Sequence, residues 1–359
     1  MSINVGEVLL NLWQKSGFNA IFVGFADGGW QNLVMLIIAC VLLYLGIVKK
    51  FEPLLLVGIA FGCLLSNLPL GGLYHQELWD NFMNPASDLY HSYGAIMREG
   101  GLLDIFYIGV KTSLYPCLIF MGVGAMTDFG PLLSNPKSLL LGAAAQLGVF
   151  VAFLGGVLLG FTGPQSASIG IIGGADGPTA IFLTTRLAPH LLGAIAVAAY
   201  SYMALIPLIQ PPIMKLLTTP ETRKIKMVQT RNVTKTEKII FPILVTIFVA
   251  LLLPDTASLV GCLMLGNLFK ETGLTDRLSD TAQNALMNIV TILLSTAVGA
   301  TMVGSTFLTA STLKIVLLGV IAFGISTAGG LLGGDVMCAL TKGKVNPLIG
   351  SAGVSAVPM

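Results

Sequence analysis

Long runs of apolar residues, separated by short polar connections, dominate this sequence. A helix needs about 20 mostly apolar residues to cross a bilayer, and such runs recur along the whole chain. The pattern predicts nine membrane-spanning helices, at residues 31–48, 53–70, 102–126, 138–162, 190–214, 239–253, 256–269, 282–308 and 313–332. Two more apolar stretches, 165–184 and 345–359, are interrupted by glycine and proline, so we expect broken or re-entrant segments there. The predicted fold class is an all-α polytopic integral membrane protein with a transporter-like arrangement.

Composition supports this assignment. Only 10% of the 359 residues are charged, 55% are hydrophobic and the mean hydropathy is +0.86, whereas a soluble domain carries about 25% charged residues. The net charge of +2 is small, and the basic residues form no stripe with interleaved aromatics, so nucleic acid is excluded as a partner. The lipid bilayer is the expected environment.

Motifs of soluble enzymes and metal sites are absent from the sequence. There is no H-E-x-x-H, no P-loop and no G-x-S-x-G. All five cysteines lie in apolar segments without a C-x-x-C pair, so we interpret them as small hydrophobic residues. The N-terminal 18 residues carry an acid, Glu7, and no basic region or cleavage site, which favours an amphipathic interfacial helix over a secretory signal.

The short loops set the orientation, because lysine and arginine are retained in the cytoplasm. Seven basic residues against two acidic ones place 215–238 in the cytoplasm, together with the basic turn 49–52, whereas the acidic loop 71–101 is external. We therefore expect five regions: an interfacial segment at 1–30, two spans and the external loop at 31–101, a first core half at 102–214, the basic loop at 215–238 and a second core half at 239–359.

The count of crossings determines how the broken segments enter the membrane. Span 138–162 leaves the cytoplasm and 190–214 must begin outside, so 165–184 enters and leaves from outside; Arg186, which this count places outside, is an objection. Residues 345–358 enter from the cytoplasm. Two discontinuous segments that point at each other from opposite faces are typical of the midplane site of a secondary transporter.

The first broken segment contains the strongest functional candidate, Asp176, within "GIIGGADGPTAIF" at 170–182. A carboxylate at bilayer depth is costly and is retained where it faces a cavity, an ion or a partner. Glycines permit unusual dihedrals, Pro178 frees a carbonyl and Thr179 adds a hydroxyl, and oxygen ligands suit hard cations. The alternative is that Asp176 only caps the second half-helix, because Asp-Gly-Pro-Thr is also a good helix start.

The second broken segment offers neutral oxygens and bare backbone, at Asn346, Gly350, Ser351, Gly353 and Ser355. One acid combined with neutral oxygens suits a monovalent cation better than a divalent one. The alternative for this segment is tight helix packing through small residues.

Polar residues elsewhere in the spans allow two interpretations each. Tyr202, in "AAYSYMALIPLIQPP" at 198–212, could relay a proton or be an ordinary buried tyrosine. The polar face of 282–308 could line a pathway or pack on a neighbouring helix. Asp104 and Lys111 lie seven residues apart and could pair or extend toward the interface, and the three histidines are expected to be solvated or interfacial.

Residues 170–217 and "KVNPLIGSAGVSAVPM" at 344–359 closely resemble the beta subunit of the sodium-pumping biotin-dependent decarboxylases. That family includes oxaloacetate, methylmalonyl-CoA, malonate and glutaconyl-CoA decarboxylases. The resemblance covers essentially the whole chain and implies a membrane subunit that decarboxylates carboxybiotin and couples this reaction to sodium export. It further implies a biotin-carrying carboxyltransferase alpha subunit and a small membrane gamma subunit as partners, a trimer, and a location in the bacterial cytoplasmic membrane.

The resemblance also implies roles for individual residues. The positions matching Asp176 and Asn346 are implicated in sodium handling, Gly350 and Ser355 match residues on the same pathway, and Tyr202 matches a tyrosine linked to sodium or the consumed proton. The family motif continues beyond the position of Met359, where this sequence stops. Two other functions stay open from the residues alone: a stand-alone ion-coupled symporter for a small organic acid, and a structural membrane anchor.

Overall fold

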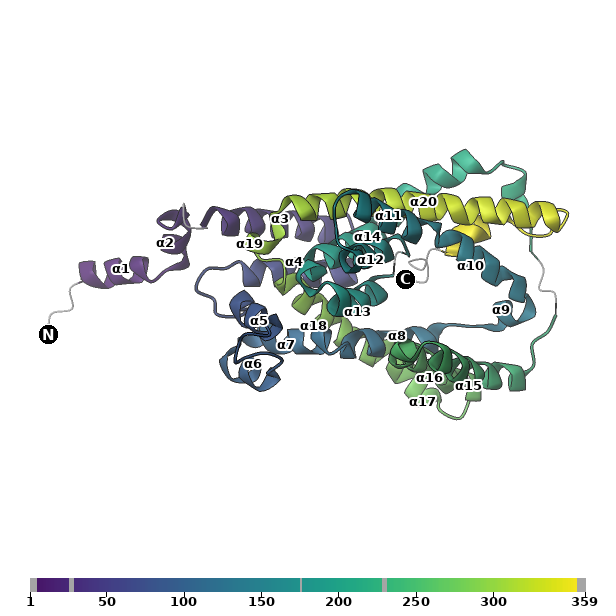
Figure 1. Cartoon of the computed structure of the whole chain (residues 1–359), viewed down its shortest axis with the longest axis horizontal. Helices are drawn as coiled ribbons and strands as arrows, with labels where there is room; N and C mark the ends of the chain where they lie inside the picture. Colours follow the sequence, from purple (N-terminus) through teal and green to yellow (C-terminus); the bar gives the residue numbers. More distant parts are fainter. Residues whose placement is uncertain (1–4, 26–28, 175, 228–230, 354–359) are drawn as a thin grey trace.

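The computed structural model describes residues 5–25, 29–174, 176–227 and 231–353, and this part of the chain folds into helices without any strand (Figure 1). Four helical segments in it are long and apolar enough to cross a membrane: α3 (Trp30–Ile47), Pro136–Leu158, Asp276–Ala300 and α20 (Ala310–Leu340). A fifth is formed if α7 (Leu102–Lys111) and α8 (Leu114–Met126), which meet at an angle of 64°, count as one span. The all-α polytopic fold predicted from the sequence is confirmed.

The remaining predicted spans coincide with helices α4 (Pro53–Ser66), α14 (Leu192–Leu217), α15 (Lys235–Leu252) and α16 (Ala257–Thr272). Predicted span 138–162 is divided at Gln146 into α10 (Leu139–Ala145) and α11 (Leu147–Leu158). Predicted span 313–332 was too short, because α20 continues for 31 residues to Leu340.

The predicted span 282–308 started and ended too late. The helical segment begins with α17 (Asp276–Thr281), passes through a π-helix at Ala282–Leu286, continues as α18 (Met287–Ala300) and ends before the short α19 (Gly304–Phe307). Buried Asn67, at the end of α4, stabilises this ending: its amide donates to the Met302 carbonyl at 2.7 Å, and its oxygen accepts from the Gly304 amide at 3.2 Å. A side chain from a neighbouring helix thus satisfies the backbone groups that continued helix would otherwise pair.

Two pairs of helices pack in parallel through glycines. In the first pair, Gly62 of α4 lies against the backbone of Thr296 in α18, and Gly299 of α18 lies against Ile59 in α4. In the second pair, Gly124 of α8 and Gly266 of α16 lie against each other's helix backbones in the same way. A Cβ at any of these four glycines would overlap backbone atoms. The parallel directions agree with the predicted topology, in which both helices of each pair cross the membrane in the same sense.

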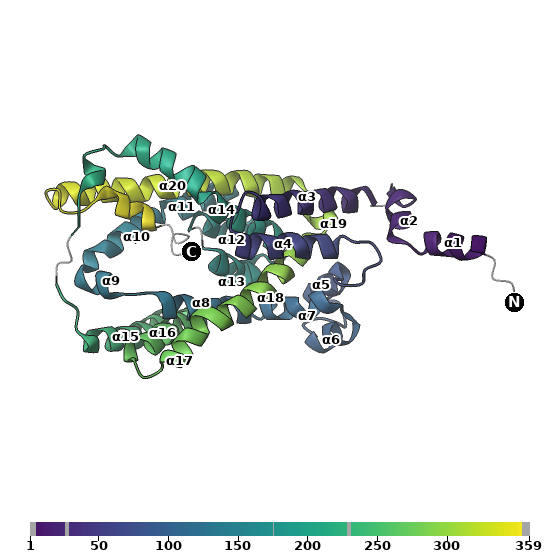
Figure 2. The same cartoon turned by 180° about the vertical axis from the view of Figure 1, so that it is seen from behind.

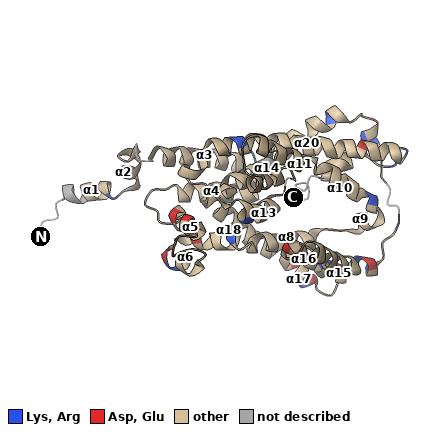
Figure 3. Ribbon diagram, in the orientation of Figure 1, with Lys and Arg blue, Asp and Glu red and all other residues tan. Residues whose placement is uncertain are grey.

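The two ends of the bundle differ in charge (Figure 3). Acidic residues gather on α5 (Gln76–Met83) and α6 (Tyr93–Glu99), in the loop predicted to be external. At the opposite end, the Lys238 ammonium donates to Asp128 at 2.8 Å and the Arg231 guanidinium donates to Glu237 at 2.9 Å. Arg186 stacks on the Phe182 ring and donates to the Asp255 carbonyl at 3.4 Å. The predicted topology places Arg186 and the connection that contains Asp255 on the same side of the membrane, and this contact is compatible with that prediction.

Asp104 anchors the external loop. Its carboxylate is completely buried and accepts hydrogen bonds from the backbone N–H groups of His75 and Gly101, from the His75 ring and from the Trp79 indole, at 2.7–3.1 Å. Asp104 therefore pairs with His75 and not with Lys111. His75 was expected to be solvated or interfacial, but it hydrogen-bonds a buried carboxylate.

Helices α1 (Val5–Gln14) and α2 (Gly17–Phe22) lie at the end of the molecule, beyond the start of α3 (Figure 2).

Candidate functional site

The first broken segment consists of two short helices and a break between them. Helix α12 (Gly163–Gly170) runs into a 3₁₀ turn at Ile171–Gly174, and helix α13 (Gly177–Leu187) begins after it. Pro178 lies in the first turn of α13, where its missing N–H costs no intrahelical hydrogen bond. The segment is thus a pair of half-helices, one of the two arrangements that the sequence predicted.

Asp176 and Thr179 form the centre of this break. The Asp176 carboxylate accepts from the Thr179 backbone N–H at 3.4 Å and from its hydroxyl at 2.5 Å. Asp176 is thus the N-cap of α13, and the capping interpretation is confirmed. The cap does not exclude an ion, because carboxylate and hydroxyl oxygens both retain lone pairs. Both side chains are only partly buried.

Helices α11 and α20 hold the break in place. Gly173 lies so close to Gly148 of α11 that a Cβ would overlap its backbone, and Ser326 of α20 donates its hydroxyl to the Gly173 carbonyl at 2.5 Å. The Gln146 side-chain oxygen lies beside Gly174. We did not single out Gln146 from the sequence, although a lone carboxamide in the middle of an apolar run was the available signal.

The second broken segment packs on α20, which also contacts the first segment. Its described part is a 3₁₀ helix at Pro347–Gly353. Gly350 and Gly330 of α20 each lie where a Cβ would overlap the other's backbone, and Gly334 lies against Pro347 in the same way. Since Ser326 and Gly330 are one helical turn apart, the two broken segments contact α20 within about 6 Å of each other along its axis. For Gly350, the expected tight packing through small residues is what the structure shows.

Asn346 makes its contacts at the cytoplasmic side of this segment. Its amide donates to the carbonyls of Arg223 and Ile225 at 3.0 and 2.9 Å, and its oxygen accepts from the Leu348 N–H at 3.0 Å. These bonds fasten the basic loop to the start of the second broken segment. Among the described residues, no hydrogen bond joins Asn346 to Asp176.

Two predicted site residues cannot be compared with the structure. Ser355 and the side chain of Tyr202 lie outside the described residues. Tyr200, one helical half-turn before Tyr202, is described: its ring lies directly against Gly177, and its buried hydroxyl has no hydrogen-bond partner among the described residues. An unpartnered buried hydroxyl beside Asp176 makes Tyr200 a further candidate that sequence reasoning did not select.

A cavity of about 260 Å³ reaches this tyrosine from the side of Glu52, in the turn that is predicted to be cytoplasmic. Tyr200 and Pro178 lie at its wall, Glu52 of the basic turn contributes a carboxylate, and α18 with the preceding π-helix contributes polar groups from Gln283, Asn288 and Thr291. Ser295, farther along α18, packs instead against Gly58 of α4. The polar face predicted at 282–308 therefore lines a cavity at one end and packs on a helix at the other.

The donor set favours a monovalent cation. The described residues contain no cluster of three or more histidine, cysteine or acidic side chains that could hold a metal ion. Asp176 instead accepts from the Thr179 hydroxyl, and the Gln146 side-chain oxygen lies beside Gly174 in the same break. Neutral oxygens of this kind are what discontinuous helices provide for sodium. Comparison with known proteins identifies the family of membrane proteins to which this chain belongs.

A family model described as "Na+-transporting oxaloacetate decarboxylase beta subunit" matches residues 31–359. The chain belongs to this family. It is 59% identical to glutaconyl-CoA decarboxylase subunit beta of Acidaminococcus fermentans, over 94% of this chain and 84% of that protein. It is 56% identical to methylmalonyl-CoA decarboxylase subunit beta of Propionigenium modestum, over 98% and 88% of the two chains. Oxaloacetate decarboxylase beta chain of Klebsiella pneumoniae is 51% identical, over 94% and 87%.

Membership in this family confirms the resemblance seen in the sequence. The chain is a membrane subunit of a sodium-transporting decarboxylase. In that setting sodium is cargo, and the broken segment around Asp176 is the candidate place for it.

Proposed function

We propose that this subunit binds sodium at Asp176 and couples the decarboxylation of carboxybiotin to the outward movement of that ion. The observation that carries the proposal is the position of a carboxylate in a membrane break that meets a cavity from the cytoplasmic end. Asp176, Thr179 and the carbonyls ending α12 are the proposed ligands, and Gln146, whose side-chain oxygen lies beside Gly174, is a further proposed ligand. Tyr200 and Tyr202 are the proposed proton-handling groups, because decarboxylation of carboxybiotin consumes a proton.

The coupling step needs a link between the partner and the ion site, and Asn346 is the proposed link. The basic loop 215–238 is the proposed docking place for the subunit that delivers carboxybiotin. Two Asn346 hydrogen bonds join this loop to the second broken segment, and α20 joins the second segment to the first. Docking can thus bias the site between two conformations, provided that these conformations differ in their affinity for sodium.

The proposed assembly follows from the family. We propose a biotin-carrying carboxyltransferase alpha subunit and a small membrane gamma subunit as partners, a trimer of this chain, and the bacterial cytoplasmic membrane as its location. The alpha subunit would select the substrate, since the relatives are named for different substrates: glutaconyl-CoA, methylmalonyl-CoA and oxaloacetate.

The purified complex in proteoliposomes tests the proposal. Decarboxylation should increase when sodium is added on the side of the soluble partner, and labelled sodium should accumulate in the lumen only while decarboxylation proceeds. Vesicles containing this subunit alone should show no such transport. Sodium-independent decarboxylation would contradict the proposal, and sodium uptake coupled to an organic acid without the partner would support the symporter instead.

A further inference from the structure

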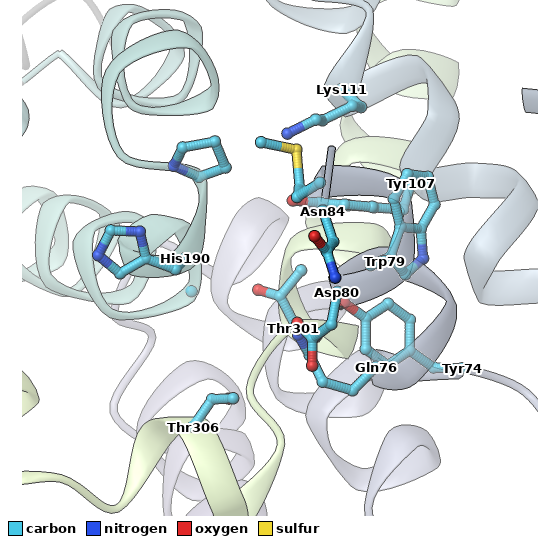
Figure 4. Close-up of a pocket in the computed structure, with 13 residues that line it drawn as sticks. Tyr74, Gln76, Trp79, Asp80, Asn84, Tyr107, Lys111, His190, Thr301 and Thr306 are labelled. Atoms are coloured by element: carbon cyan, nitrogen blue, oxygen red, sulfur yellow. Dashed lines mark hydrogen bonds between the residues drawn. The ribbon is translucent and has the colours of Figure 1, made fainter. Parts of the chain in front are cut away.

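A second cavity, of about 370 Å³, opens at the external end of the bundle (Figure 4). The external loop, α7, the start of α14 and the end of α18 line it, and the loop wall is firmly built. Trp79 in that wall donates to buried Asp104 at 2.8 Å and packs edge-on against Tyr107, with ring centroids 4.6 Å apart. The cavity is therefore a fixed feature of the fold rather than a gap under a loose loop.

Lys111 contributes a partly buried positive charge to this cavity. It is the last residue of α7, the end remote from the external loop, and its ammonium points into the space (Figure 4). Within the described chain, this ammonium has no carboxylate partner, because Asp104 is fully engaged by the external loop and Asp80 binds Gln76 at 2.9 Å. Asp80 is exposed at the rim, where solvent screens its charge.

The inner end of the cavity approaches the candidate sodium site along α14. Gly193 and Thr301 form its wall there, and a Cβ on Gly193 would come within 2.8 Å of the Thr301 hydroxyl oxygen. Tyr200 is seven residues farther along α14, on the same helix face and about 10 Å away. Gly177 and Asp176 lie directly beyond Tyr200. The candidate site is thus placed between a cytoplasmic and an external cavity that share α14.

We propose that the external cavity is the exit vestibule for sodium and that Lys111 is an electrostatic valve in it. The unpaired positive charge lowers the affinity of the outward-facing site for sodium and opposes re-entry of ions from outside. This inference rests on the proposed function. In general, a unit charge about 10–15 Å from a bound monovalent ion changes the dissociation constant of that ion about threefold to tenfold at an intermediate dielectric constant.

Inhibition by luminal sodium measures this effect. In proteoliposomes of the complex, the substrate and soluble partner are added to the outer solution. Only molecules whose cytoplasmic face points to the outer solution then react, and the external cavity of these molecules opens into the lumen. Sodium is varied in the lumen at constant ionic strength. Lys111→Met should lower the luminal concentration that half-inhibits decarboxylation about threefold to tenfold, whereas Lys111→Arg should behave as wild type. Lys314→Met is the matched control, because Lys314 contacts the Leu159 carbonyl and does not line the cavity.

A second pair of variants covers the case in which Lys111→Met does not fold. Asn84 is exposed and lines the cavity, so Asn84→Asp adds a negative charge there and should shift inhibition in the same direction. Asn81→Asp, on the same helix but not lining the cavity, should leave it unchanged. An unshifted half-inhibitory concentration in both Lys111→Met and Asn84→Asp overturns the valve. Loss of sodium stimulation in the wild type would instead contradict the proposed function.

Discussion

The two broken segments place a glycine against a glycine of a crossing helix in the same manner: Gly173 against Gly148, and Gly350 against Gly330. The polar groups of the two segments differ. The first segment holds a carboxylate and a hydroxyl at its break, whereas the described part of the second holds neutral groups. The second segment in turn is fastened to the basic cytoplasmic loop through Asn346. The difference suggests a division of labour, in which one segment binds the ion and the other transmits the state of the partner.

Asp176→Asn is the sharpest test of the first segment. Asparagine caps a helix as well as aspartate does, so the fold should persist while the charge is lost. We expect sodium-stimulated decarboxylation to fall roughly 100-fold, equivalent to about 2.7 kcal/mol. The matched control is Asp335→Asn, in α20 but away from the break. A normal sodium response of Asp176→Asn would leave the residue with its capping role only.

Gly330→Ala tests the glycine contact between the second segment and α20, the helix on which both segments pack. The added methyl would overlap the Gly350 carbonyl, and overpacking of this kind costs about 1–3 kcal/mol. We expect a lower thermal midpoint of the detergent-purified protein. Gly324→Ala, on the same helix, is the control, because the nearest atom to its Cβ is 3.7 Å away. Equal midpoints for the two variants would show that the contact is not restrictive.

Asn346→Ala separates a linking role from an ion-binding role. Loss of two hydrogen bonds, each worth about 1 kcal/mol, should free the basic loop and speed tryptic cleavage near Arg223 about tenfold. Partner-driven decarboxylation should decline with it. Asn135→Ala, at the same end of the bundle, is the control. If the apparent affinity for sodium falls while the cleavage rate stays constant, Asn346 is a ligand rather than a link.

Tyr200→Phe examines the unpartnered hydroxyl beside the first segment. Removing a buried hydroxyl that has no partner should leave stability unchanged or slightly higher. We nevertheless expect decarboxylation to fall about threefold to tenfold, the lower range for loss of a proton-transfer group. Tyr115→Phe provides a buried tyrosine on α8 as the control. Unchanged turnover would identify Tyr200 as a packing residue.

The sequence predicted features that depend on residues close together in the chain, and missed features that depend on contacts between distant segments. The break at 165–184 and the capping role of Asp176 follow from glycine, proline and an acid within a few residues, so both could be predicted. The end of α18 depends on Asn67 from a distant helix, and the orphaned hydroxyl of Tyr200 depends on its contact with Gly177. Contacts of this kind have no signal in a linear pattern. Asp104 was misjudged for the same reason, because its partners lie in another loop.

The smallest expected effect concerns the ion pair between Asp128, which follows α8, and Lys238 of α15. The hydrogen bond from Lys238, followed by that from the Gly130 N–H, holds the pKa of Asp128 below its usual range. A lowered pKa in the folded state stabilises the protein above the unfolded pKa of about 3.9, and this stabilisation is lost as the pH falls below it. Because the side chain is 53% exposed, we expect at most about 0.5 kcal/mol. Thermal midpoints of wild type and Asp128→Asn should therefore differ slightly at neutral pH and converge in acid. A large difference that persists in acid would mean that Asp128 acts through packing, and the two ends of the bundle would then differ less in construction than the buried Asp104 suggests.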